Sequence, residues 1–228
     1  MVAEKPGTTR PGDIYIIGAH IDSTVRSPAN PLLRAPGADD NASGSAAVLL
    51  AAELLAPYHF DGTIRFVLFT GEEQGLWGSR AYAADVADEN IQGMVNLDMI
   101  AWDSRDGPDV DLHAKQSLVP ASMDLAALFQ DVVDTYDLDL LPVIYGNGIS
   151  ASDHSPFWNQ GFAAILAIEN YSGDGSTASD FNTYYHSIND LSVHINQDLF
   201  GEMARAALAT LAHSAGPVSY THLRAHET

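Results

Sequence analysis

The chain has 228 residues, of which 46% are apolar, and it contains no cysteine. This length and composition predict one globular domain with a full hydrophobic core. The lack of cysteine excludes disulfides and thiolate metal sites, and the longest apolar runs, such as 14–19 and 163–168, are too short to span a membrane. The formal net charge of −20 argues against a nucleic-acid partner, because phosphate binding needs clustered Lys and Arg. An acidic field could attract a cation such as the free amino terminus of a peptide, but the simpler interpretation, which we favour, is that the acidity keeps a secreted or salt-tolerant protein in solution.

Apolar runs bounded by turn residues predict buried strands, and amphipathic stretches between them predict helices. In chain order, the predicted elements are strands at 2–5 and 14–19, a helix at 43–56, strands at 63–70 and 94–99, a helix at 122–136, a strand at 163–168 and a helix at 197–212. Asn41 and Ser43 are alternative caps for the first helix. This alternation predicts an α/β fold: a single-domain, three-layer sandwich with a mostly parallel mixed sheet and helices on both faces.

The two ends of the chain have unusual features. Residues before 14 contain no apolar segment of a signal peptide, and we expect native sequence, including any signal peptide, to lie upstream of them. The domain is therefore predicted to comprise residues 1–217 and to be truncated at its N-terminus. Residues 218–228 resemble a translated sequencing adapter, so we expect an artefactual tail and leave its histidines out of functional reasoning.

Polar residues that can bind metal ions follow each of the four long predicted strands. They are His20 and Asp22 after the first, Glu72 and Glu73 after the second, Asp98 at the end of the third and Glu169 after the fourth. In open α/β sheets, ligands bind beyond the carboxyl ends of the strands. Surface residues without a function would not be expected after the end of every strand. The pattern therefore predicts a ligand-binding site at the edge of the sheet formed by the carboxyl ends of the strands.

The spacing of His20 and Asp22 suits a supported metal ligand. Residues two apart on a strand point the same way, so the Asp22 carboxylate is expected to accept a hydrogen bond from the far nitrogen of His20. Taken alone, this pair is weak evidence, because a histidine with a nearby aspartate is common at a strand end.

Two pairs of adjacent carboxylates are more informative. Asp39 and Asp40 precede a predicted helix, where capping explains one carboxylate but not two, and we assign Asp40 to bridge two cations. Glu72 and Glu73 follow a buried strand, which is costly unless a cation compensates. We expect Glu73 to bind metal and Glu72 to reach a metal-bound water.

The last two candidates are Asp98 and His186, which alone could be a capped strand end and a satisfied loop histidine. Together with the other three predicted ligands they make a set of two histidines and three carboxylates. Such a set suits zinc, in pairs roughly 3.5–4 Å apart, whereas magnesium prefers fewer imidazoles and more water.

The ordered segments GAHIDS (18–23), PGADDNASG (36–44), TGEEQGLWGS (70–79), NLDM (96–99) and YYHSIND (184–190) resemble the co-catalytic di-zinc aminopeptidases, the family of the secreted bacterial leucyl aminopeptidases. The resemblance implies that His20 and Asp98 hold one zinc ion and that Glu73 and His186 hold the other. It also implies that Asp40 bridges the two ions beside a cis peptide bond to Asn41, and that Glu72 is the general base.

Further roles also come from the resemblance. Asp22 would support His20, and Asp153 and His154 would pack near the substrate pocket and support the metal ligands from behind. Some members place a tyrosine that stabilises the oxyanion where this chain has Ile149. Tyr185 resembles the alternative donor of other members. Tyr184 is the other choice, and either ring could simply pack.

The implied function is an extracellular or periplasmic metallo-aminopeptidase that removes N-terminal, apolar residues from peptides through a water bridging two zinc ions. Its partner is a peptide or aminoacyl substrate, with no nucleic acid and no membrane, and its oligomeric state is open. One alternative is a transferase resembling glutaminyl cyclases with a single zinc ion, which the five-ligand set disfavours. Another is an inactive family member acting as a binding module, although no predicted ligand is missing.

Overall fold

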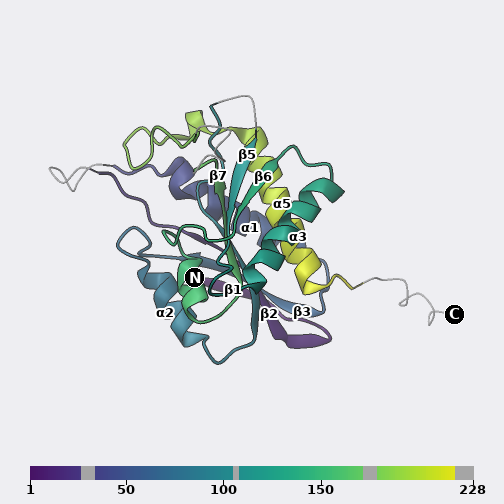
Figure 1. Ribbon diagram of the computed structural model, residues 1–228. Coiled ribbons are helices and arrows are strands. Elements are labelled where there is room, and N and C mark those ends of the chain that lie inside the picture. The colour runs from purple at the N-terminus through teal and green to yellow at the C-terminus, as the bar shows by residue number, and fades with distance from the viewer. Residues whose placement is uncertain (27–33, 105–107, 172–178, 219–228) are drawn as a thin grey trace.

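The computed structural model describes residues 1–26, 34–104, 108–171 and 179–218, which form a sheet with helices packed on both sides (Figure 1). The predicted adapter-derived tail lies outside the described residues except for Val218. The strands are β1 Val2–Lys5, β2 Arg10–His20, β3 Gly62–Phe69, β4 Ile91–Leu97, β5 Asp109–His113, β6 Leu141–Tyr145 and β7 Ala164–Glu169.

In the described part of the chain, the strands form one seven-stranded sheet in the order β1-β3-β2-β4-β7-β5-β6. The four central strands, β3, β2, β4 and β7, run parallel to one another. β1 is antiparallel to β3, β5 is antiparallel to β7, and β6 is parallel to β5. The carboxyl ends of the four long predicted strands therefore meet side by side at one edge of the sheet, and the prediction of a mostly parallel mixed sheet is confirmed.

Within the described residues, five α-helices cover the two faces of the sheet. They are α1 Gly44–Leu55, α2 Trp77–Asp85, α3 Ala121–Thr135, α4 Ser155–Asn159 and α5 Gln197–Ala215, with a π-helical segment η1 at Ala38–Ser43 and a 3-10 turn η2 at Ser192–His194. Figure 1 shows α3 and α5 on one side of the strands and α2 on the other. The predicted three-layer sandwich is thus confirmed.

Alternation along the strands separates the core into two layers. Ile17 and Val95 point into the cluster formed with α1, α3 and α5. Ile16 and Met94 point into the cluster formed with α2 and α4. Strands buried on both faces read as continuous apolar runs, which is why their sequences predicted them.

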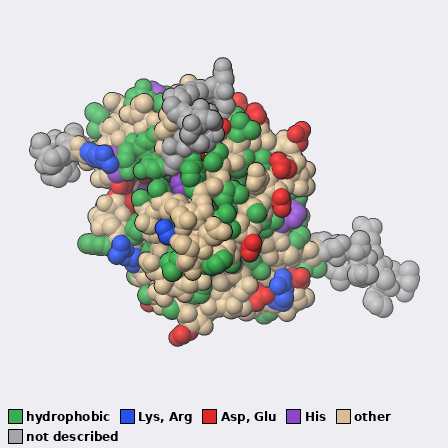
Figure 2. All heavy atoms as spheres, in the orientation of Figure 1, with side chains coloured by type: hydrophobic (Ala, Val, Ile, Leu, Met, Phe, Trp, Pro, Cys, Tyr) green, Lys and Arg blue, Asp and Glu red, His purple; other side chains and the backbone are tan. Residues whose placement is uncertain are grey.

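Acidic side chains lie at separate places across the visible face of the molecule rather than in one patch (Figure 2). In the part of the chain that the structure describes, none of the helices combines the length and the apolar character needed to cross a membrane.

Candidate metal centre

The ends of β2, β3 and β4 bring metal-competent side chains from distant parts of the chain together. His20 is the last residue of β2, and Asp98 directly follows β4. Two groups result, His20 with Glu72 and Asp98, and Asp40 with Glu73 and His186. Within each group the potential ligand atoms all lie within 4.8 Å of one another. All five predicted ligands and the predicted base therefore meet at one edge of the sheet.

Asp40 lies between the two groups. Its Oδ1 is 3.2 Å from His20 Nε2, and its Oδ2 is 3.0 Å from His186 Nε2. The peptide bond between Asp40 and Asn41 is cis, as the resemblance predicts. Since each oxygen faces a different histidine, this carboxylate has the arrangement that a bridging ligand needs.

The remaining contacts complete each group. His20 Nε2 lies 3.2 Å from Asp98 Oδ1, and His186 Nε2 lies 2.9 Å from Glu73 Oε2. Burial alone would lower the pKa of His186, but its hydrogen bonds with Asp40 and Glu73 outweigh burial and raise that pKa to about 9. Each imidazole therefore lies in an anionic environment.

This arrangement fits divalent cations. Asp40, Glu72, Glu73 and Asp98 converge on two imidazoles, and carboxylates this close repel one another unless protons or cations compensate. Glu73 Oε1 is buried and has no hydrogen-bond partner among the described residues. An oxygen with that much unused acceptor capacity suits a metal ligand, and mixed histidine and carboxylate donors suit zinc.

Asp22 supports the site differently from the prediction. His20 Nδ1–H donates to the backbone carbonyl of Asp22 at 2.9 Å, while the nearest oxygen of the Asp22 carboxylate is 3.8 Å away. That carboxylate instead accepts from the backbone N–H groups of Glu72, at 3.3 Å, and Glu73, at 3.2 Å. The predicted side-chain contact was wrong because β2 ends at His20, so the alternation of a strand does not extend to Asp22. The bond to the Asp22 carbonyl still leaves His20 Nε2 to face the candidate metal site.

Ser152 holds Asp98 in place. Its hydroxyl donates to Asp98 Oδ2 at 2.6 Å and accepts from Asn96 Nδ2 at 2.8 Å. The next two residues, Asp153 and His154, are both buried. Burial, with the charge of Asp98 among the further causes, raises the pKa of Asp153 to about 7.

His154 lies against the protein interior rather than the candidate ligands. Its Nε2–H donates to the carbonyl of Ile149 at 3.0 Å, and its ring packs edge-on against Trp158 with centroids 4.3 Å apart. Burial lowers the pKa of His154 to about 3, so the ring is neutral at ordinary pH. These contacts fit the packing role expected of His154, whereas the expected support of a metal ligand by this ring is wrong, because its one hydrogen bond among the described residues goes to the backbone of Ile149.

Two carboxylates that hold the loop of Asp40 had no assigned role in the sequence analysis. Asp39 accepts from the backbone N–H of Ala101 at 3.0 Å and from Asn182 Nδ2 at 2.9 Å. Asp190 accepts from the backbone N–H groups of both Asp39 and Asp40. The pairing of Asp39 with Asp40 was a visible signal, because capping could not explain both carboxylates.

Asn41 rather than Ser43 caps the first helix through its side chain. Asn41 Oδ1 accepts from the N–H of Gly44 at 2.9 Å, while the Ser43 hydroxyl donates to the carbonyl of Asp39 at 2.7 Å. The residue beside the cis bond thereby ties the candidate metal loop to the start of α1.

The two neighbouring tyrosines face different surroundings. Tyr185 lines the cavity at the site and stacks on His186 with ring centroids 3.6 Å apart. Tyr184 stacks on His194, with centroids 4.0 Å apart, and meets Trp102 edge-on. Of the two, Tyr185 is therefore the ring placed at the candidate site.

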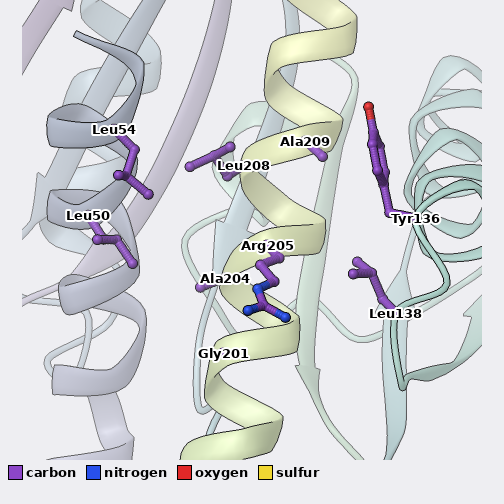
Figure 3. A pocket seen from close by; sticks show the side chains of 9 residues that line it. All are labelled: Leu50, Leu54, Tyr136, Leu138, Gly201, Ala204, Arg205, Leu208 and Ala209. Carbon is purple, nitrogen blue, oxygen red and sulfur yellow. The ribbon is translucent and has the colours of Figure 1, made fainter. Parts of the chain in front are cut away.

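Charged and apolar residues together line the cavity at the site. Its volume is about 80 Å³, and it is lined by His20, Asp40, Glu72, Asp98 and His186 together with apolar residues that include Met99, Ile149, Leu166, Ile168 and Phe181. A larger groove of about 480 Å³ runs along α5 (Figure 3), but Arg205 is the only charged residue among those lining it. The chemistry-bearing residues thus belong to the smaller cavity.

Residues 1–211 match the sequence profile of Peptidase family M28. The chain belongs to peptidase family M28. Among curated relatives, leucine aminopeptidase 1 of Arthroderma otae is 33% identical over 181 residues, covering 74% of this chain and 47% of the relative. Aminopeptidase YwaD of Bacillus subtilis is 29% identical over 214 residues, covering 90% of this chain and 42% of the relative.

The fold of the M28 chain is also that of a solved zinc aminopeptidase, BSAP from Bacillus subtilis. The TM-score is 0.78 at 24% identity, and the match covers 94% of this chain and 50% of that one. The resemblance stated from the motifs is therefore confirmed at the level of the family. The M28 chain spans about half or less of the length of the curated relatives it matches.

Proposed function

We propose that this M28 chain is the catalytic part of an aminopeptidase with two zinc ions. His20 and Asp98 would hold one ion, Glu73 and His186 the other, and Asp40 would bridge them. The observation that carries the proposal is that the two oxygens of Asp40 face two different histidines, at 3.2 and 3.0 Å. The similarity to aminopeptidase YwaD of Bacillus subtilis supports the same activity.

Zinc, when bound, supplies a Lewis acid that polarises a peptide carbonyl and lowers the pKa of a water molecule. Glu72 is proposed as the group that moves the proton, from the attacking water to the leaving amine. Burial, followed by the charge of Asp98, raises the pKa of Glu72 to about 9, and His20 opposes the rise. When burial raises the pKa of a carboxyl group and neighbouring cations lower it again, the group can take up and release a proton near neutral pH.

The cavity supports a preference for an apolar N-terminal residue. Met99, Leu166 and Ile168 form a buried apolar cluster against which Ile149 and Phe181 pack. This wall would take the first side chain of the peptide, while the carboxylates beside it would attract the free amino group. Tyr185, at the same cavity, is proposed to donate its hydroxyl to the developing oxyanion.

Metal analysis and a paired activity assay test the proposal. The purified protein, loaded with zinc, is expected to contain two ions and to hydrolyse leucine p-nitroanilide but not its N-acetylated form. Hydrolysis of both compounds would contradict an aminopeptidase. A single zinc ion with cyclisation of N-terminal glutamine would instead favour the glutaminyl cyclase alternative, and zinc binding without turnover would favour a binding module. Action outside the cytoplasm stays a prediction from the resemblance.

A further inference from the structure

Asp190 binds the backbone of the loop that carries Asp40. Its carboxylate accepts from the N–H of Asp39, at 3.1 Å to Oδ1 and 3.2 Å to Oδ2, and from the N–H of Asp40, at 3.1 Å to Oδ2. The side chain is buried, with 3% exposure. A third carboxylate beside Asp39 and Asp40 costs electrostatic free energy, which hydrogen bonds from the two backbone N–H groups offset. The Asp190 carboxylate therefore fixes the position of this backbone, and we call such a residue a fastener.

The same residue belongs to the loop that carries His186. The N–H of Asp190 donates to the carbonyl of Ser187 at 3.3 Å, and its carbonyl accepts from the N–H of Ala38 at 3.1 Å. Asp190 therefore joins the loop of His186 to the loop of Asp40 twice, through its backbone carbonyl and through its side-chain carboxylate. The 3.0 Å contact between Asp40 Oδ2 and His186 Nε2 closes this ring of interactions.

The other half of the site has separate support. Asp98 is held by Ser152, whose hydroxyl also accepts from Asn96. The structure gives no direct hydrogen bond between Ser152 and Asp190, and the two residues fasten different groups of candidate ligands. Loss of one fastener should therefore disturb one group more than the other.

We propose that Asp190 is a positioning residue that sets Asp40 against His186, so that the ion held by Asp40, Glu73 and His186 depends on Asp190, while the ion held by His20 and Asp98 depends on Ser152. This inference rests on the proposed two-ion site. Residues that orient metal ligands typically contribute about 10- to 100-fold to metal affinity.

Zinc titration against a chromophoric chelator, with native mass spectrometry to count ions on the folded protein, tests the inference. Asp190→Asn is expected to weaken binding of one of the two ions by about 10- to 100-fold and to weaken binding of the other, which shares only the bridging Asp40, by less. Ser152→Ala should also weaken one ion, and the double variant should weaken both, because the two fasteners serve different ions. Asp131→Asn makes the same chemical change at an exposed position of α3 and should bind zinc as the parent protein does.

A second variant separates position from charge. Asp190→Glu keeps the negative charge but lengthens the side chain, so a positioning role predicts weakened binding in this variant as well. Parent-like affinity in Asp190→Glu, with weak binding in Asp190→Asn, would overturn the inference in favour of a purely electrostatic effect. Circular dichroism of the metal-free proteins identifies any variant that fails to fold. If Asp190→Asn does not fold, the zinc affinity of Asp190→Glu alone tests the positioning role.

The remaining outcomes separate this inference from the proposed function. If the parent protein binds two ions and Asp190→Asn binds them equally well, the inference is wrong and the proposed function stands. If the double variant loses only one ion, the division between Asp190 and Ser152 is wrong. If the parent protein binds no zinc, both the proposed function and the inference fail.

Discussion

Replacing Glu72 by glutamine separates proton transfer from metal binding. The Glu72 carboxyl lies in the group formed with His20 and Asp98, and glutamine keeps its shape while removing its ability to carry a proton. The Asp22 carboxylate binds the backbone N–H groups of Glu72 and Glu73, so the substitution leaves the loop fastened. Glu72→Gln is therefore expected to fold and to bind two zinc ions within about tenfold of the parent affinity.

Turnover should respond very differently. General acid–base catalysis contributes about 10²- to 10⁴-fold to a rate, which corresponds to roughly 3–5 kcal/mol of transition-state stabilisation. The measurement is kcat on leucine p-nitroanilide beside zinc content, with Glu53→Gln, on the exposed side of α1, as the matched control. If Glu72→Gln kept its zinc and more than about a tenth of the parent kcat, proton transfer by Glu72 would be refuted.

Three other predictions concern the site and the core. Tyr185→Phe should lower kcat by about 10²-fold if the hydroxyl stabilises the oxyanion, while Tyr184→Phe, whose ring packs on His194, should leave kcat nearly unchanged; equal effects would remove the assignment. Zinc binding at pH 7.5 should release protons, because the pKa of His186 is raised to about 9; an indicator dye in weak buffer should report this release, and apparent affinity should rise with pH until about pH 9. Phe129→Ala should lower the free energy of unfolding in urea by about 3–5 kcal/mol, since Phe129 is a fully buried residue of α3.

The long central strands could be predicted because they are buried on both faces, whereas the shorter elements lacked such a signal. β5 alternates apolar residues with the buried Asp111 and His113, so its sequence does not form an apolar run. β6 contains Pro142 and lies at the edge of the sheet, where proline is tolerated but demotes a strand prediction. α4 has only five residues, too few for a helical period to be read.

The sequence predicted the positions of those site residues that lie at the ends of strands. His20 and Asp98 are placed by β2 and β4, and the edge rule for parallel strands brings them together without further information. His186 and Asp190 lie between β7 and η2, so their positions depend on tertiary contacts that no local pattern encodes. Only the ordered resemblance placed His186, and the fastening role of Asp190 became visible from its backbone partners.

The geometry of the carboxylates couples protons and metal ions at this edge. In the metal-free protein, burial and neighbouring carboxylates raise the pKa of Glu72 to about 9, and carboxylate hydrogen bonds overcome burial to raise that of His186 to about 9. Both groups therefore bind protons in the folded state at pH values where they would be free of them in the unfolded chain. Their contribution to stability is complete below the unfolded pKa values and is lost as pH rises through about 9. Zinc would replace those protons with fixed positive charge. Bound zinc should therefore stabilise the folded state most in the pH range where Glu72 and His186 lose their protons.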